Sequence, residues 1–318
     1  MARPFLKWAG GKGQLLSEIT DRLPLNFSKE INTYVEPFLG GGAVFFRIIE
    51  KFKFQQVFIS DINPELVLCY RTIQSDVEGV IKELNSLQLK YLPFDEEKRK
   101  EMYYSIRTIW NCGVGIKSLS RKKRIIRASQ MIFMNRTCFN GLFRVNSLGK
   151  FNVPMGSYKN PRIVDEENLR SVSNILQNIV IENYSYEQCE SNIDSATFVY
   201  FDPPYRPIDP TSSFTSYAKS GFNDDDQTRL GLFFSMLSKR NCKLMLSNSD
   251  PHDDFFDELY SEFKINRVLA SRNINSVGSK RGKVNEIIVT NYEHDAVSND
   301  VNQVIQAKLS QFEHDDQQ

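Results

Sequence analysis

The sequence predicts an α/β fold in which a parallel sheet is interrupted by a long, mostly helical insertion. Three observations support this fold class. Residues 32–60 alternate a strand, a glycine-rich loop, a helix and a second strand, an apolar strand at 197–200 ends at two prolines, and strands and helices alternate again after residue 164. With 318 residues, 41% of them hydrophobic, the chain is long enough for one large α/β domain and a smaller one.

The expected elements alternate regularly along most of the chain. Strands are predicted at 32–36, 56–60, 179–182, 197–200, 243–247, 264–268 and 284–292, and helices at 43–52, 64–91, 95–110, 121–134, 166–176 and 224–239. Residues 136–161 are expected to form a hairpin or loop region with a turn at Leu148 and Gly149. The basic segment within 64–163 then reads as an insertion into the sheet formed by 1–63 and 164–318.

The first strand, loop, helix and strand have the pattern of a nucleotide-binding βαβ unit. Glycines 40–42 let backbone amides approach a ligand closely, and Asp61 at the tip of the second strand can accept hydrogen bonds from ribose hydroxyls. The glycine spacing departs from the dinucleotide fingerprint, which disfavours a pyrophosphate ligand. A phosphate-binding P-loop around Lys12 is excluded, because its first glycine would fall at Leu6 and its hydroxyl residue at Gly13.

Asp202, Pro203, Pro204 and Tyr205 directly follow the apolar strand that ends near residue 201. Neither proline can donate to a sheet ladder, so the strand ends in a rigid turn that carries an acid and an aromatic ring. At that edge of a parallel sheet, a carboxylate, exposed proline carbonyls and a flat ring suit a planar base that bears an exocyclic amine. The alternative is a solvated Asp-Pro turn beside a packed tyrosine.

The net charge of +1 conceals a strongly basic segment. Residues 102–164 contain no Asp or Glu but twelve of the 40 Lys and Arg residues, which leaves 28 basic residues to face 39 acidic ones elsewhere. A basic run alone is more often a solvated surface, but here Phe, Tyr and Asn residues are interleaved with the charges. That mixture suits phosphates, base edges and unstacked base steps, so we expect this segment to bind nucleic acid.

Metal, disulfide and membrane sites are not indicated. The five cysteines are widely separated without a CxxC pair, and the three histidines do not cluster near them. No apolar stretch approaches the roughly 20 residues that cross a bilayer, and no apolar signal region follows the N-terminus. We therefore expect a cytoplasmic protein with reduced, mostly packed thiols.

Ten segments with distinctive sequences follow one another in a specific order, at residues 7–12, 36–42, 61, 135–136, 139–144, 151–154, 158–159, 202–205, 213–217 and 286–292. This ordered set resembles the Dam-type DNA adenine N6-methyltransferases, the alpha group of the D12 class, over about residues 3–293. The resemblance implies a Rossmann-like methyltransferase sheet that uses S-adenosylmethionine, and a target-recognition domain inserted at 64–163. Duplex DNA is the implied partner and GATC the implied target, and we expect a monomeric protein of bacterial or phage origin.

The resemblance also implies roles for individual residues. The methyl donor would be bound by Trp8, Lys12, Phe38, Gly40, Gly42, Asp61 and Asp202, and the catalytic turn would be Asp202, Pro203, Pro204 and Tyr205. DNA would be contacted by Lys7, Phe139, Asn140, Leu142, Arg144, Pro154, Tyr158 and Lys159. For Trp8, packing in the core is the alternative to a ligand contact.

Bond chemistry then suggests a mechanism. Asp202 and the Pro203 carbonyl are expected to accept the two hydrogens of the adenine amine while Tyr205 stacks on the extruded base, with no covalent enzyme intermediate. Phe139 is expected to act as a wedge in the duplex. Arg144 is expected to bind a guanine edge, with a phosphate contact as its alternative role.

Several alternatives remain open from the sequence. The same turn would serve methylation of cytosine N4 or of RNA adenine, and a catalytically inactive DNA-binding regulator is a further reading, whereas a nicotinamide-dependent dehydrogenase is disfavoured. Residues 213–217 are expected to close over substrate or to form an ordinary surface loop. Residues 294–318 are expected to form a helical extension that packs on the catalytic domain or docks a partner. A role in restriction–modification, repair marking or regulation is not decided.

Overall fold

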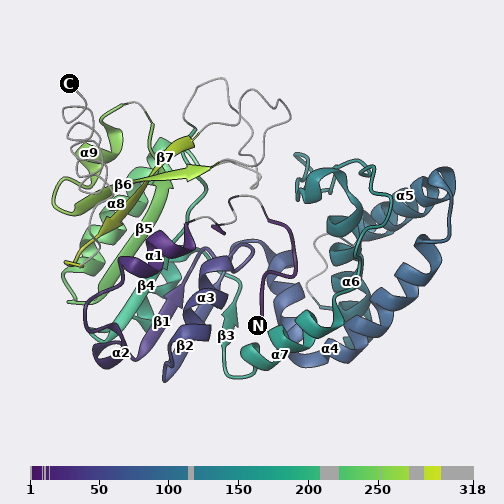
Figure 1. Ribbon diagram of the computed structural model, residues 1–318, viewed down its shortest axis with the longest axis horizontal. Helices are drawn as coiled ribbons and strands as arrows, with labels where there is room; N and C mark the ends of the chain where they lie inside the picture. Colours follow the sequence, from purple (N-terminus) through teal and green to yellow (C-terminus); the bar gives the residue numbers. More distant parts are fainter. Residues whose placement is uncertain are drawn as a thin grey trace, which may run out of the picture.

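A seven-stranded sheet forms the centre of the computed structural model, which describes residues 2–8, 10, 12–13, 15–113, 118–207, 222–251, 253–271 and 283–294. Its strands are β1 (Thr33–Glu36), β2 (Gln56–Ser60), β3 (Val180–Glu182), β4 (Thr197–Phe201), β5 (Lys243–Ser249), β6 (Lys264–Ser271) and β7 (Lys283–Thr290). They lie in the order β3-β2-β1-β4-β5-β7-β6 (Figure 1). The first five are parallel, and β7 runs antiparallel to both β5 and β6.

The helices of the sheet-bearing part are α1 (Leu16–Asp21), α2 (Phe27–Glu30), α3 (Ala43–Lys51), α7 (Glu166–Leu176), α8 (Asp224–Ser238) and α9 (Phe255–Leu259), with a 3₁₀ helix, η2, at Tyr186–Asn192. The intervening region contains α4 (Pro64–Tyr91), α5 (Glu96–Cys112), α6 (Arg121–Thr137) and the 3₁₀ helix η1 (Phe139–Gly141). The α/β fold class and each expected strand and long helix are confirmed. The largest differences are a β6 that ends three residues later and an α6 that continues to Thr137.

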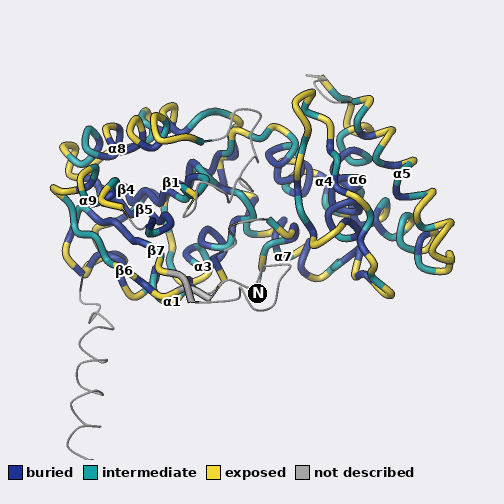
Figure 2. The backbone as a smooth tube through the Cα atoms, turned by 90° about the horizontal axis from the view of Figure 1, so that it is seen from above, coloured by how far each residue is buried: buried dark blue, intermediate teal, exposed yellow. Residues whose placement is uncertain are grey.

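Helical layers cover both faces of the sheet, because successive side chains of a strand point to opposite sides. On β4, Phe198 and Tyr200 belong to the buried cluster shared with α1, α3 and α4, whereas Val199 and Phe201 belong to the cluster shared with α8 and α9. Every residue of β4 is buried. The continuous apolar run of this strand is therefore explained by its central position between two layers (Figure 2).

The region between β2 and α7 stands beside the sheet as a helical body with α4 as its link (Figure 1). The Asn63 side chain caps α4 by accepting hydrogen bonds from two backbone N–H groups, and Pro64 occupies the first turn. Non-helical dihedral angles at Asp76 break this helix into two parts. The buried cluster runs without interruption from the sheet through Tyr70 to Trp110, so the helical body shares its core with the sheet. A domain boundary at residues 64 and 163 stays a prediction.

Of residues 136–161, the first two belong to the end of α6, and residues 138–161 form an irregular segment, which we call the hairpin segment. It is held by η1 and by two isolated bridges, Cys138 with Met155 and Val145 with Phe151. Within the described part of the chain, no helix is long and apolar enough to cross a bilayer. Residues 213–217, expected to close over substrate or to form a surface loop, lie outside the described residues, as does all of the expected helical extension at 294–318 except His294.

Candidate active site and nucleic-acid interface

The candidate active site lies where the strand order of the sheet reverses. From β1 the chain continues outward to β2 and β3, then returns to β4 on the other side of β1. In open parallel sheets this switch point leaves a crevice outside the carboxyl ends of the strands. The loop after β1, residues 37–42, and the turn after β4, residues 202–205, both start at this edge, as the sequence predicted.

Asp202 is paired with a buried ammonium group. Lys12, whose side chain is 4% exposed, places Nζ 2.7 Å from Asp202 Oδ1, and the Ser247 hydroxyl donates to the same oxygen over 3.3 Å. Burial raises the pKa of the Asp202 carboxyl, and the Lys12 ammonium partly offsets that effect. The solvated Asp-Pro turn considered above is therefore wrong, because this carboxyl is half-buried and bonded inside the site.

The same ammonium lies over the Tyr205 ring. Lys12 Nζ is 3.9 Å from the ring centroid, which is a close cation–π contact. The Tyr205 hydroxyl donates to Glu286 Oε2 over 2.7 Å. Burial, followed by the nearby Asp202 and Glu286 carboxyls, raises the pKa of Tyr205 well above its usual value. The hydroxyl therefore stays protonated and acts as a donor.

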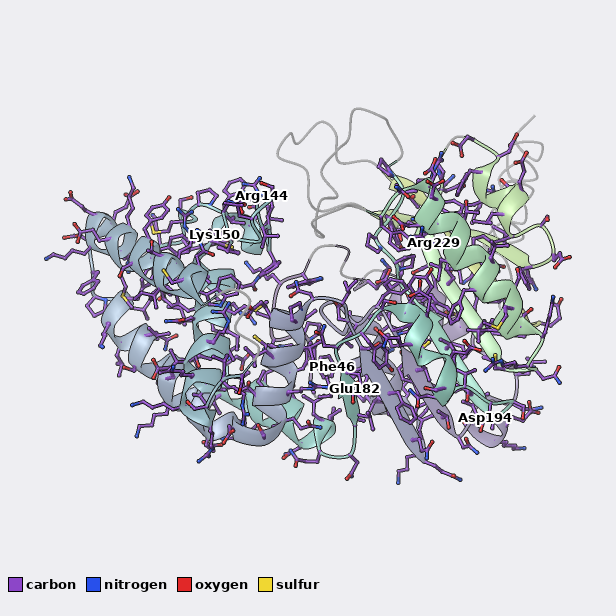
Figure 3. All side chains as sticks on the ribbon, turned by 180° about the vertical axis from the view of Figure 1, so that it is seen from behind. Phe46, Arg144, Lys150, Glu182, Asp194 and Arg229 are labelled. Atoms are coloured by element: carbon purple, nitrogen blue, oxygen red, sulfur yellow. The ribbon has the colours of Figure 1, made fainter. Side chains whose placement is uncertain are left out.

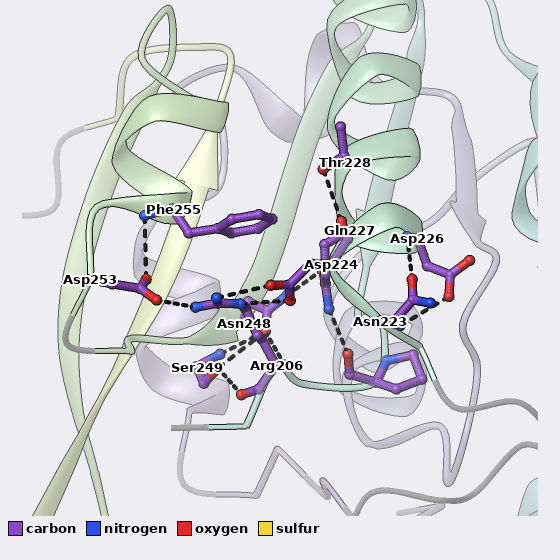
Figure 4. Close-up of polar contacts among 11 residues, drawn as sticks. Arg206, Asn223, Asp224, Asp226, Gln227, Thr228, Asn248, Ser249, Asp253 and Phe255 are labelled. Carbon is purple, nitrogen blue, oxygen red and sulfur yellow. Dashed lines mark hydrogen bonds and ion pairs between the residues drawn. The ribbon is translucent and has the colours of Figure 1, made fainter. Parts of the chain in front are cut away.

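Two buried amide side chains hold the backbone of the turn (Figure 4). Gln227 Nε2 donates to the Pro204 carbonyl over 3.0 Å, and Gln227 Oε1 accepts from Asn248 Nδ2 at 3.0 Å. Asn248 Oδ1 accepts from the Arg206 backbone N–H at 3.1 Å. Both amide residues are fully buried. Among the described residues, none donates a hydrogen bond to the Pro203 carbonyl.

The glycine loop is tied to the acid that follows β2. Gly40 and Gly42 have φ angles of +49° and +72°, which glycine adopts without strain. Asp61 accepts the Gly40 N–H at 2.9 Å through one carboxyl oxygen and the Asn63 N–H at 2.8 Å through the other. Burial raises the pKa of Asp61, and these two hydrogen bonds partly offset that rise. Each oxygen retains capacity for a further donor, as a ribose contact requires.

A buried carboxyl that the sequence analysis assigned no role lies beneath the site. Glu36, the last residue of β1, is 2% exposed and accepts a hydrogen bond from the Tyr34 hydroxyl. Burial raises the pKa of Glu36 well above its usual value; the hydrogen bond from Tyr34 and the charge of Lys12 oppose the rise, whereas the charges of Asp202 and Asp61 add to it. Glu36, Asp61 and Asp202 therefore form an acidic site around a single described ammonium group, that of Lys12.

Trp8 and Phe38 are packed side chains next to this site. Trp8 stacks on Phe143 with ring centroids 5.1 Å apart and planes 22° apart, and a Cβ atom on either Gly40 or Gly41 would lie 3.1 Å from it. Phe38 stacks on Tyr186 and belongs to the cluster shared with α8. Both rings are half-buried, so they shape the walls around the glycine loop.

The predicted DNA-contacting residues gather on the hairpin segment and the chain before residue 8. Phe139 is 48% exposed, and its N–H donates to the Pro154 carbonyl over 2.9 Å. Lys7 Nζ lies 4.9 Å from the Tyr158 ring centroid. The set comprises Lys7, Phe139, Asn140, Arg144, Pro154 and Lys159, which are exposed, and Leu142 and Tyr158, which are half-buried.

The Asn135 amide joins these two segments. Its Oδ1 accepts the Lys7 N–H, and its Nδ2 donates to the Lys7 and Gly141 carbonyls, all at 2.8 Å. A Cβ atom on Gly141 would lie 2.3 Å from the Lys7 side chain, which explains why glycine is needed there. The hairpin segment and the N-terminal segment therefore form one surface.

Only part of the basic segment faces outward. Five of its arginines bind other parts of the protein: Arg107 donates to the Val153 carbonyl, Arg121 pairs with Asp76, Arg127 with Glu65, Arg136 donates to the Phe5 carbonyl, and Arg162 pairs with Asp165. The described basic side chains that are exposed are Arg121, Lys122, Lys123, Arg144, Lys150, Lys159 and Arg162; the ion pairs of Arg121 and Arg162 lie at the surface. Figure 3 shows Arg144 and Lys150 together at the hairpin end of the helical body. Binding of nucleic acid by this segment stays a prediction.

Comparisons with known proteins identify the family. The model of the D12 class N6 adenine-specific DNA methyltransferases matches residues 8–274. The chain is 50% identical over 292 residues to the Type II methyltransferase M.MjaIII of Methanocaldococcus jannaschii, covering 91% of this chain and 99% of the relative. It is 41% identical to the Type II methyltransferase M1.LlaDCHI of Lactococcus lactis subsp. cremoris (91% and 95% covered) and 33% identical to the DNA adenine methylase of Escherichia coli K12 (90% and 94% covered). The chain therefore belongs to the D12 class of N6 adenine-specific DNA methyltransferases.

Proposed function

We propose that this protein transfers a methyl group from S-adenosylmethionine to N6 of an adenine flipped out of duplex DNA, with GATC as the target sequence. The observation that carries the proposal is the Asp202 carboxyl beside the Tyr205 ring, both in contact with one ammonium group at the carboxyl end of β4. A carboxylate and a backbone carbonyl together accept both hydrogens of an exocyclic amine. An aromatic ring next to them stacks on the extruded base.

The residues around the glycine loop fit this methyl donor, which supplies an electrophilic methyl group on a positively charged sulfur. The Asp202 carboxyl and the Tyr205 ring already hold one cation, the Lys12 ammonium, at this site. The proposed donor-binding set is Trp8, Lys12, Phe38, Gly40, Gly42, Asp61 and Asp202.

The turn is proposed to activate the adenine amine by holding its hydrogens. The N6 lone pair is delocalised into the ring, so the amine is a poor nucleophile until its N–H bonds are fixed in a geometry that releases the pair. Asp202 and the Pro203 carbonyl accept these hydrogens, because Gln227 already engages the Pro204 carbonyl. Asp202 need not be a strong base, since the proton is lost readily once the nitrogen is methylated and positively charged. Entry of the base displaces the Lys12 ammonium from Asp202 and from the Tyr205 ring.

The hairpin surface is proposed to grip the duplex and support base flipping. Unstacking and unpairing a base costs on the order of a few kcal/mol, which phosphate contacts and a wedge such as Phe139 offset. Arg144 is proposed to read a guanine edge; its Nε at present donates to Asn152 Oδ1, which orients the guanidinium. The remaining proposed DNA contacts are Lys7, Asn140, Leu142, Pro154, Tyr158 and Lys159.

The experiment that tests the proposal is a methylation assay with product identification. Purified protein, labelled S-adenosylmethionine and a duplex with one GATC site are incubated, and the nucleosides are separated by mass spectrometry. N6-methyladenine confined to GATC supports the proposal, whereas N4-methylcytosine, methylation only of RNA, or no methylation contradicts it. A matched duplex with GTTC is the control for the target sequence, and Asp202→Asn, which keeps the size of the side chain, is the control for the site.

The names of two relatives support a place in restriction–modification, since both are Type II methyltransferases. We propose a cytoplasmic, monomeric protein of bacterial or phage origin. A partner bound through residues 294–318 is the remaining proposal on assembly, and sedimentation of the full chain tests it.

A further inference from the structure

Tyr205 is held at three separate points of the structure. Gln227 binds the carbonyl of the preceding residue, and Asn248 binds the N–H of the following residue, Arg206. The Ser249 hydroxyl donates to the Arg206 carbonyl over 2.6 Å (Figure 4). The backbone is therefore fixed on both sides of Tyr205. The far end of the ring is fixed separately, through the hydrogen bond from its hydroxyl to Glu286.

Glu286 reaches this hydroxyl from a part of the sheet that carries none of the predicted site residues. It lies on β7, where its backbone is paired with Ser249 on β5 and with Val268 on β6. Because β7 has hydrogen-bonded strands on both sides, the position of Glu286 is set by the sheet and not by a loop. A 2.7 Å O–H···O bond to this carboxyl restricts the ring to one orientation.

We propose that Glu286 is a positioning residue for methyl transfer: it binds the Tyr205 hydroxyl and so holds the ring in the orientation that receives the flipped adenine. This inference rests on the proposed function. It adds a residue that does not touch the base and acts through Tyr205. The physical reason is preorganisation, because a ring already fixed in place loses no orientational freedom when the base stacks on it.

The structure also suggests a rival explanation for any effect of Glu286. Its charge acts on Asp202 and raises the pKa of that carboxyl, so Glu286 could influence the site through its charge alone. Glu286→Gln separates the two explanations, because the amide oxygen of the new side chain still accepts the hydrogen of the Tyr205 hydroxyl but the negative charge is lost. Tyr205→Phe removes the hydroxyl and keeps the ring.

The test is a double-mutant cycle with the full-length protein and a GATC duplex. The variants are Glu286→Ala, Glu286→Gln, Tyr205→Phe and the double variant Glu286→Ala with Tyr205→Phe. We expect Glu286→Ala and Tyr205→Phe each to lower kcat about tenfold, and the double variant to lower it about tenfold as well, since both changes remove one interaction. Glu286→Gln is expected to stay within about twofold of the wild type.

The KM for the methyl donor separates positioning from a general loss of structure. We expect KM to change less than kcat, because the bond orients the base and not the donor. Glu293→Ala, which removes a carboxyl paired with Lys264 at the surface, is the control and leaves kcat unchanged. Melting temperatures identify any variant that is unfolded; Glu286→Gln and Tyr205→Phe preserve volume and keep the test available if Glu286→Ala does not fold.

Two results would overturn the inference while leaving the proposed function intact. One is a double variant whose kcat falls about a hundredfold, the product of the two single effects, which means that the two residues act independently. The other is a Glu286→Gln variant whose kcat falls as far as that of Glu286→Ala, which means that the negative charge of Glu286 is responsible. By contrast, a wild-type protein that forms no N6-methyladenine contradicts the proposed function itself.

Discussion

Gly42 occupies a turn whose left-handed backbone strains alanine, and its replacement by alanine is our main prediction of stability. Its φ of +72° places it in the left-handed region, where an L-residue costs about 1–2 kcal/mol. A Cβ atom there would lie 2.6 Å from the hydroxyl of Tyr70, which is fully buried, and 3.2 Å from Phe46. Overpacking of this kind costs about 1–3 kcal/mol. We therefore expect Gly42→Ala to lower the free energy of unfolding by about 2–5 kcal/mol.

Urea unfolding and thermal melting of the purified variant measure this effect. The expected fall in melting temperature is on the order of 10 °C. Gly13→Ala is the matched control, because no described atom lies within 4 Å of its Cβ position and its φ is not positive. A Gly42→Ala protein that melts within about 1 °C of the wild type would refute the reasoning, since it would mean that the turn tolerates both the strain and the contact with Tyr70.

Three further predictions follow from other parts of the molecule. Lys12→Met removes the cation that lowers the pKa of Asp202, whereas burial still raises that pKa. The acid limb of the pH profile of kcat/KM for the methyl donor should therefore move to higher pH, and an unchanged limb contradicts this prediction. Arg144→Ala should cost about 1–3 kcal/mol of discrimination at one base pair, whereas Lys159→Ala should weaken binding to all DNA sequences equally. If binding titrations show that Arg144→Ala also weakens all sequences equally, Arg144 contacts a phosphate instead of a base. Arg127→Ala leaves the half-buried carboxylate of Glu65 on α4 without its ion pair, so the free energy of unfolding measured in urea should fall by about 3–5 kcal/mol. The control is Lys98→Ala, which removes an exposed ion pair and should lack this effect.

The fold could be predicted because its signals are local. The uninterrupted apolar run at 197–200 indicates a strand buried on both faces, and β4 is that strand, at the centre of the sheet. The two prolines after Asp202 mark its end, and the glycines after β1 mark the turn into α3. The periodicity of the long helices at 64–91, 95–110 and 121–134 indicates the helical body.

The contacts that complete the site could not be predicted, because they join residues far apart in the chain. Gln227 lies in the first turn of α8 and Asn248 near the end of β5, and nothing in their sequence surroundings indicates that they bind the turn after β4. Glu286 belongs to a matching segment of the sequence, but its bond to Tyr205 spans 81 positions. The charge pattern was an incomplete guide for a similar reason, since partners such as Glu65 for Arg127 are supplied by a helix 62 positions away.

Trp8 has one face against Phe143 of the hairpin segment and lies against the backbone of Gly40 and Gly41. A single indole thus contacts both the loop proposed to bind the methyl donor and the surface proposed to bind the duplex. Thermodynamic linkage then makes the two affinities mutually dependent: if donor occupancy tightens DNA binding by some factor, DNA tightens donor binding by the same factor. Replacing this indole with a smaller side chain should bring both factors toward one.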